Sequence, residues 1–155
     1  MKPARAVGII LKDNQVLLMY RIKNGKEYYV FPGGGVEKDE SVEDAVLREI
    51  LEETTLKVKV NRKLYLHDYD ESEGHYYLCE YIEGKPELGD SIEKELMARD
   101  KGNFYRPEWM NIDKLEEILI YPLEIRDWLM ADLENGFPET VRVAKLKTAE
   151  LRQSR

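Results

Sequence analysis

The sequence predicts an α/β (α+β) domain, a sandwich in which a mixed β-sheet is flanked by helices on both faces. Three observations support this fold class. Short apolar runs with a period of two residues are separated by turn residues, as expected for β-strands. One helical pattern follows three consecutive glycines, and a second, amphipathic one lies near the C-terminal end. The expected order of elements is therefore β-β-β-α-β-β-β-α-α.

The N-terminal third contains three expected strands and one helix. The strands cover residues 4–11, 15–22 and 28–31, separated by the turn-like sequences KDN and KNGKE. After the loop PGGGVEKDE, a helix is expected from Ser41 to about Thr54. Ser41 is a suitable N-cap, and Asp44 three residues later fits a capping box.

A hairpin and a further strand are expected next. Residues 56–70 alternate well enough for a long strand, ESEG suits a turn, and residues 75–84 return as the partner strand. Residues 85–102 are polar and rich in glycine and charge, which indicates a long loop with at most a short helical turn. The strand expected at 103–112 contains Pro107, which favours an edge position or a bulge.

The C-terminal part is expected to hold two helices and a weakly patterned tail. The first begins at an Asp113 cap and covers residues 113–120. The second follows Pro122, presents an apolar face and ends at Gly136. Without repeats or a linker, residues 1–136 are predicted to form a single domain, and the basic residues 137–155 its C-terminal extension.

Composition limits the classes of protein. A chain of 155 residues with 43% hydrophobic and 35% charged residues suits one soluble globular domain. The single cysteine, Cys79, excludes an internal disulfide framework and fits a reducing compartment. No segment approaches the roughly 20 apolar residues that a membrane span needs. A cytoplasmic protein without a membrane partner is therefore expected.

The net charge of −7 is concentrated in one segment. Residues 34–56 contain two basic residues, Lys38 and Arg48, and eight acidic ones, Glu37, Asp39, Glu40, Glu43, Asp44, Glu49, Glu52 and Glu53. Such a patch repels DNA and phosphates unless a cation lies between them. The acidity therefore indicates a local site.

Three of these glutamates share one face of the expected helix. Glu49, Glu52 and Glu53 fall within an arc of roughly 100° beside the apolar face. Like charges four residues apart cost roughly 0.2–0.5 kcal/mol per pair, and anions oppose the dipole at a helix C-terminus. A solvated glutamate face is the alternative interpretation. The preceding glycines allow close backbone approach, Glu40 can join from the N-terminal side, and such hard oxygen ligands suit Mg²⁺ or Mn²⁺.

Residues 34–56, GGVEKDESVEDAVLREILEETTL, resemble the box of the Nudix (MutT-like) hydrolases. That box is glycine, five residues, glutamate, seven residues and then R-E-U-x-E-E-x-G-U, where U is a bulky aliphatic residue. Its fixed positions are met at the correct spacing by Gly34, Glu40, Arg48, Glu49, Ile50, Glu52, Glu53 and Leu56. A weaker resemblance extends over residues 4–133.

Only Thr55 departs from the box, because it stands where the family has glycine. Glycine would adopt the left-handed conformation that ends a helix at little cost. A β-branched residue resists it by roughly 1–2 kcal/mol. We therefore expect either a left-handed Thr55 or a helix that ends differently.

The resemblance implies a Nudix-type α/β/α sandwich that hydrolyses a nucleoside diphosphate linked to another moiety, X. Glu49, Glu52 and Glu53 match the family's principal metal ligands and base, and Glu40 matches a secondary metal contact. Gly34, or its neighbour Gly35, matches a carbonyl donor to the metal. Arg48 matches the arginine that orients a box glutamate by a salt bridge.

The general base is the least transferable of these roles, since some family members use a box glutamate and others use an acid from a downstream loop. The corresponding loop here, residues 85–102, offers Glu87, Asp90, Glu93, Glu95 and Asp100. Glu93 is preferred, although a solvated loop acid is the alternative for each.

Two residues outside the box are candidates for substrate binding. Arg21, at the end of a strand, is placed to reach a phosphate, with a surface salt bridge as the alternative. Tyr29 precedes the glycine turn and is placed to stack on a base, with ordinary core packing as the alternative.

The substrate expected by default is a nucleoside triphosphate, bound as a small molecule with Mg²⁺ or Mn²⁺. The alternatives are a non-catalytic nucleotide-sensing domain and an RNA-cap-type hydrolase. Catalytically inactive members of the family usually lose one or more of the box glutamates, whereas all of them are present here, which disfavours the sensing domain. Nucleic acid is disfavoured, because the basic residues gather only in the tail. A homodimer is left open.

Overall fold

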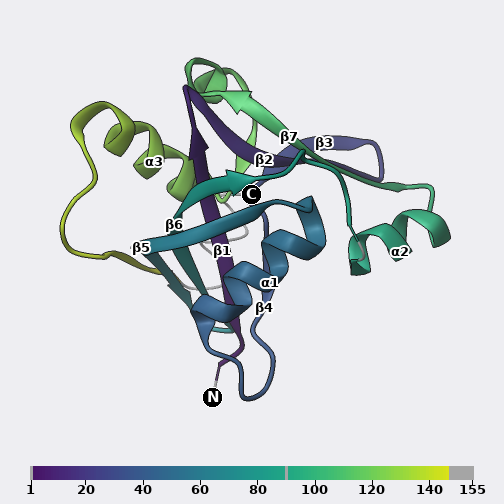
Figure 1. Ribbon diagram of the computed structural model, residues 1–155, viewed down its shortest axis with the longest axis horizontal. Helices are drawn as coiled ribbons and strands as arrows, with labels where there is room; N and C mark the ends of the chain where they lie inside the picture. Colours follow the sequence, from purple (N-terminus) through teal and green to yellow (C-terminus); the bar gives the residue numbers. More distant parts are fainter. Residues whose placement is uncertain (1, 90, 147–155) are drawn as a thin grey trace.

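The computed structural model describes residues 2–89 and 91–146, apart from the side chains of residues 92, 93 and 146 (Figure 1). The strands are β1 (Ala4–Lys12), β2 (Gln15–Lys23), β3 (Lys26–Val30), β4 (Gly33–Gly35), β5 (Lys57–Tyr69), β6 (Glu73–Glu83), β7 (Asn103–Asn111), β8 (Ile120–Tyr121) and β9 (Arg142–Leu146). The helices are α1 (Val42–Thr54), α2 (Ile92–Arg99) and α3 (Leu123–Asn135), with a 3-10 helix η1 (Ile112–Glu117).

The described strands form one mixed sheet in the order β8-β3-β2-β1-β6-β5-β9, with β4 paired to β1 and β7 paired to β2. The pairs β1–β6, β3–β8 and β5–β9 are parallel, and the other pairs are antiparallel. In the described part β7 pairs only with β2, so Pro107 lies on an edge strand, as predicted.

Strands β1 and β2 are joined only near their shared turn. Each has nine residues, but the ladder between them covers only Leu11↔Val16 and Lys12↔Gln15. Beyond this point β1 pairs with β4, and β2 pairs with β3. The sheet therefore divides into a β1 arm (β1, β4, β5, β6 and β9) and a β2 arm (β2, β3, β7 and β8).

Helices cover both faces of the sheet, and the alternation of side chains along β1 shows why. Ile10 packs with Ile50 of α1, whereas Ile9 packs with Leu129 of α3. The mixed sheet with helices on both faces is therefore confirmed. Cys79 lies in the core beneath α1, where burial raises the pKa of its thiol to about 12.

Helix α1 has the predicted start and one of the two predicted ends. The Ser41 hydroxyl accepts a hydrogen bond from the backbone N–H of Asp44 at 3.1 Å. Thr55 is left-handed, with φ 60° and ψ 5°, and its N–H donates to the carbonyl of Leu51. Its hydroxyl also donates to the carbonyl of Lys85 at 2.8 Å, so the strained residue holds the segment that leaves β6.

The structure corrects the C-terminal half in two places and shows a further short element in its tail. Residues 85–102 contain the eight-residue helix α2, which Ser91 caps. Helix η1 is capped by Asn111 and not by Asp113, because the Asn111 side chain accepts from the N–H of Asp113 at 2.8 Å. The tail contributes β9, which runs parallel to β5 from Tyr65 onward. The domain boundary at residue 136 stays a prediction.

No helix among the described residues is long and apolar enough to cross a lipid bilayer.

Candidate active site

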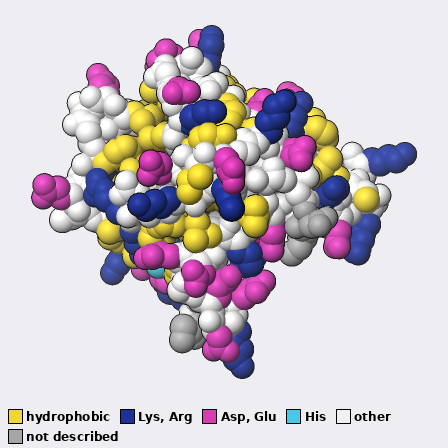
Figure 2. Space-filling model, viewed as in Figure 1, with side chains coloured by type: hydrophobic (Ala, Val, Ile, Leu, Met, Phe, Trp, Pro, Cys, Tyr) yellow, Lys and Arg dark blue, Asp and Glu magenta, His cyan; other side chains and the backbone are white. Residues whose placement is uncertain are grey.

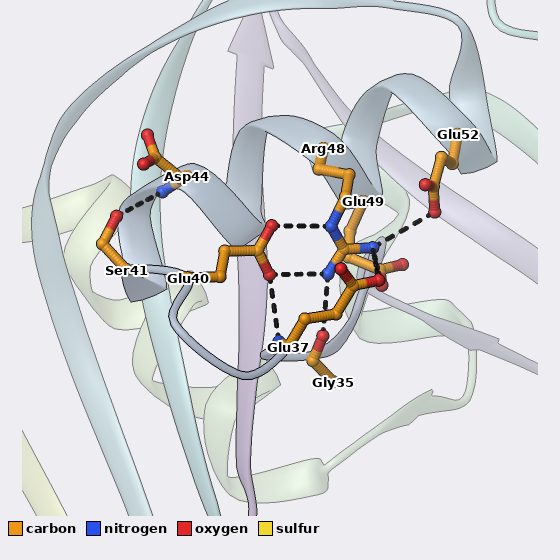
Figure 3. A network of polar contacts seen from close by, with 8 residues as sticks. All are labelled: Gly35, Glu37, Glu40, Ser41, Asp44, Arg48, Glu49 and Glu52. Atoms are coloured by element: carbon orange, nitrogen blue, oxygen red, sulfur yellow. Dashed lines mark hydrogen bonds and ion pairs between the residues drawn. The ribbon is translucent and has the colours of Figure 1, made fainter.

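Arg48 of α1 lies at the centre of a network of carboxylates from α1 and from the loop before it (Figure 3). Its Nε and Nη2 donate to the two oxygens of Glu40 at 2.7 and 2.9 Å. Its Nη1 donates to Glu49 at 2.8 Å and to Glu52, one helical turn later, at 3.3 Å. Nη2 also donates to the carbonyl of Gly35 at 2.9 Å, which ties the glycine strand to the helix. One guanidinium therefore organises most of the acidic site.

The fork between Arg48 and Glu40 dominates the electrostatics of this network. This fork, together with a hydrogen bond from the N–H of Glu37, lowers the pKa of Glu40 to about 2. The same contacts raise the pKa of Arg48. Because both oxygens of Glu40 engage Arg48, this geometry supports a positioning role for Glu40, and direct contact with a metal would need a rearrangement.

Glu53 is separated from that network and faces the gap between the two arms of the sheet. It is buried, with 4% of its surface exposed, and its Oε2 accepts from the N–H of Gly33 at 2.9 Å. Gly34 lies directly against the carboxylate of Glu49, since a Cβ at position 34 would be 2.4 Å from Cδ of Glu49. The glycines thus allow the strand β4 to approach two carboxylates closely.

The donor set fits a hard divalent cation. Glu49, Glu52 and Glu53 supply only carboxylate oxygens from one side of α1, which suits Mg²⁺ or Mn²⁺. Among the described residues, no group of three or more Asp, Glu, His or Cys side chains is already arranged to hold a metal ion. The network gives the reason, because Glu49 and Glu52 both face Nη1 of Arg48.

A cleft of about 600 Å³ opens where β1 and β2 diverge. Cationic and aromatic side chains dominate its walls, and Glu53 is the one acid among its described lining residues. The cations are Arg5, Arg21, Lys23 and Lys26, and the aromatic residues are Tyr28, Phe31, Tyr69, Tyr76, Tyr105 and Tyr121. Such a lining suits a ligand that carries both negative charge and an aromatic ring.

Arg21 lies on the wall of this cleft between two tyrosines. It pairs with Tyr28 on β3 and with Tyr105 on β7 in the strand register, so all three face the same side. Its guanidinium is 4.2 Å from the ring centre of Tyr105 and 5.4 Å from that of Tyr28. Its Nη2 donates to the Tyr105 hydroxyl at 2.6 Å. The structure thus brings Arg21 to the cleft.

The structure does not bring Tyr29 to the cleft, which corrects the prediction that it stacks on a base. Tyr29 faces the other side of β3, where its ring centre is 5.3 Å from that of Tyr20. Burial there raises the pKa of Tyr29. Tyr28 occupies the cleft position instead, and the alternation of strand residues relative to Arg21 would have indicated it.

A second hollow, of about 940 Å³, lies between β4, α1 and α2 and is called the acidic groove below. Glu37, Glu49 and Glu52 line it from the box, and Lys94 and Glu95 line it from α2. On the face seen in Figure 2, acidic side chains gather over α1 and the loop before it. The side chain of Glu93 lies outside the described residues, so its predicted role as a base is not placed here.

The comparisons with known proteins agree with this geometry. The profile of the NUDIX domain matches residues 2–131, so the chain belongs to the Nudix hydrolase family. The chain is 41% identical over 100 residues to an ADP-ribose pyrophosphatase of Methanocaldococcus jannaschii, covering 59% of each chain. It is 45% identical over 53 residues to an RNA pyrophosphohydrolase of Pelagibacter ubique, covering 33% of this chain and 34% of that one.

The alignments thus span less than two thirds of these two relatives' lengths. Among solved structures, a NUDIX hydrolase from Nitrosomonas europaea superposes with a TM-score of 0.71 at 15% identity, covering 94% of this chain and 80% of that one. At that identity the likeness concerns the fold alone.

Proposed function

We propose that this Nudix hydrolase is a pyrophosphohydrolase, dependent on a divalent cation, that cleaves a nucleoside diphosphate linked to X, with a nucleoside triphosphate as the preferred substrate. The single observation that carries the proposal is the position of Glu53. This carboxylate belongs to the acidic face of α1 and also lines the cleft of tyrosines and cations. A nucleotide in that cleft would therefore bring its phosphates to the carboxylates.

The glutamates of α1, Arg48 and Arg21 have different proposed roles. Glu49, Glu52 and Glu53 would hold the cation, which when bound neutralises phosphate oxygens and polarises water. Arg48 holds Glu49 and Glu52 in position through Nη1. Arg21 is placed on the cleft wall to contact the nucleotide.

The reaction is a hydrolysis. The water oxygen forms a bond to one phosphorus, the bond from that phosphorus to the bridging oxygen breaks, and a carboxylate accepts the proton of the water. Glu95 is a candidate for this base because it lines the acidic groove with Glu49 and Glu52. Glu93, from the same helix, is the base predicted from the sequence, and separate Glu93→Gln and Glu95→Gln variants would distinguish the two.

The test is a substrate panel. Nucleoside triphosphates, ADP-ribose, dinucleoside polyphosphates and 5′-triphosphorylated RNA are incubated with the protein and Mg²⁺ or Mn²⁺, and the released phosphate, pyrophosphate, nucleotides and sugar phosphates are measured. Turnover of a triphosphate to a monophosphate and pyrophosphate is expected. Glu52→Gln and Glu53→Gln should each lower the rate at least about tenfold. Absence of turnover with both cations would favour a nucleotide-sensing domain.

ADP-ribose is the second candidate substrate, favoured by the name of the Methanocaldococcus jannaschii relative. It shares the diphosphate linkage and requires the same carboxylates. In the panel it would release AMP and ribose 5-phosphate. The two candidates are therefore separated by the products alone.

A further inference from the structure

Arg5 lies at the junction between the cleft and the acidic groove. It is the one charged side chain among the described residues that lines both hollows. The carboxylates of Glu49 and Glu52 line the groove on one side of this junction, and Glu53 lines the cleft on the other. A ligand that extends from the cleft to these carboxylates must pass Arg5.

The strand register places no side chain directly opposite Arg5. Its cross-strand neighbours are Gly35 on β4 and Gly74 on β6, and neither carries a side chain. Directly opposite residues in a sheet normally pack against each other. With glycine at both of these positions, no opposite side chain separates Arg5 from the two hollows that it lines.

None of the side chains that the structure describes is a counterion of Arg5. Within the described residues its guanidinium makes no hydrogen bond and no ion pair, although Arg48 nearby engages several carboxylates. Arg5 is exposed and lines both hollows, so its positive charge is available to a ligand at the junction. Its planar fork matches the oxygens of a phosphoryl group.

We propose that Arg5 is a catalytic residue that donates hydrogen bonds to the scissile diphosphate where the substrate crosses from the cleft to the acidic groove. This assignment rests on the proposed pyrophosphohydrolase function. Arg5 binds non-bridging oxygens of the attacked phosphoryl group and stabilises the negative charge that develops there as the bridging bond breaks. The nucleoside then lies in the tyrosine-lined cleft, and X extends toward α2.

The experiment compares Arg5→Ala and Arg5→Lys with a matched control, Lys12→Ala. Lys12 lies on the same strand at the opposite end, over the ring of Tyr81, and loses the same charge away from both hollows. Turnover of the best panel substrate is measured, and binding of inorganic pyrophosphate with Mg²⁺ is measured by calorimetry. Because Arg5 is exposed, its variants should keep the wild-type unfolding midpoint.

Arg5→Ala should lower kcat at least about thirtyfold and weaken pyrophosphate binding at least about tenfold, with Arg5→Lys in between and Lys12→Ala unchanged. Wild-type values of both kcat and pyrophosphate affinity in Arg5→Ala would overturn the assignment, and so would equal losses in Lys12→Ala. If the wild type turned over no substrate but bound pyrophosphate more tightly than Arg5→Ala, the proposed hydrolase function would be refuted and the phosphate-binding role of Arg5 would be supported. If it bound no pyrophosphate and Arg5→Ala kept its kcat, the site itself would fail.

Discussion

Alanine at position 34 should slow hydrolysis by about 100-fold while leaving the fold nearly intact. The new Cβ would lie 2.4 Å from Cδ of Glu49 and 2.5 Å from each of its carboxylate oxygens, whereas ordinary contact begins at 3.4 Å. The carboxylate must therefore retreat by about 1 Å, and a misplacement of that size can cost about 10²-fold in rate. Because the end of a flexible side chain moves, we expect a stability cost of only about 1 kcal/mol.

The two neighbouring glycines provide matched controls. A Cβ at Gly35 would meet nothing within 4 Å, so Gly35→Ala should keep the rate within about threefold. A Cβ at Gly33 would lie 2.4 Å from the carbonyl oxygen of Ala6, which is backbone, so Gly33→Ala should lose about 1–3 kcal/mol of stability. Initial rates with Mg²⁺ and urea denaturation measure the two effects. A wild-type rate in Gly34→Ala, or an equal loss in Gly35→Ala, would refute the reasoning.

Three further predictions follow from contacts around the site. The pKa of Glu40 is lowered to about 2 by Arg48, so this ion pair stabilises the fold above the ordinary value of 4.5. That contribution is lost as the pH falls from about 4.5 to about 2, and the urea midpoints of wild type and Glu40→Gln should converge over this range. Thr55→Gly should be more stable in urea than Thr55→Ala by about 1 kcal/mol. Both variants lose the hydroxyl contact to Lys85, but only glycine relieves the left-handed strain. Equal urea midpoints for the two variants would contradict this. Tyr28 lines the cleft, so Tyr28→Ala should raise KM at least about fivefold without a matching loss of stability. Tyr29 packs against the core, so Tyr29→Ala should destabilise the fold by about 1–2 kcal/mol and keep KM. Steady-state kinetics and urea unfolding of both variants check this pair of predictions.

The features that could be predicted from the sequence are those that local chemistry determines. The start of α1 follows from the hydroxyl of Ser41, and its left-handed end at Thr55 is one of the two ends that the sequence left open. The long hairpin β5–β6 follows from the alternation of apolar and polar side chains in two neighbouring segments, which pair with each other across a short turn. The shared face of Glu49 and Glu52 follows from helical spacing.

The missed features depend on partners distant in the sequence. Strand β4 consists of three glycines, which carry no side-chain pattern, and only its pairing with β1 makes it a strand. The strand β9 pairs in parallel with β5, a contact across more than seventy residues that no local pattern indicates. Arg5 lines the cleft between two glycines of β4 and β6 that are distant in the sequence, whereas Tyr28 lies opposite Arg21 in a local hairpin and could have been found from strand alternation.

The parallel pairing of β9 with β5 leaves half of a long strand edge without a strand partner among the described residues, and the side chains on that half bear on whether another chain can pair with it. In the described part, β9 pairs with residues 65–69 of β5 and leaves the outer edge of residues 57–63 without a strand partner. Bare edges of this length invite edge-to-edge aggregation, and lysines are a common protection. Lys57 and Lys59 are exposed on this half, and Arg62 donates to the carbonyl of Pro138 at 2.7 Å, which draws the approach to β9 across the edge. The charges of Lys57, Lys59 and Arg62 thus lie on the unpaired half of β5, where an added strand would have to desolvate or displace them.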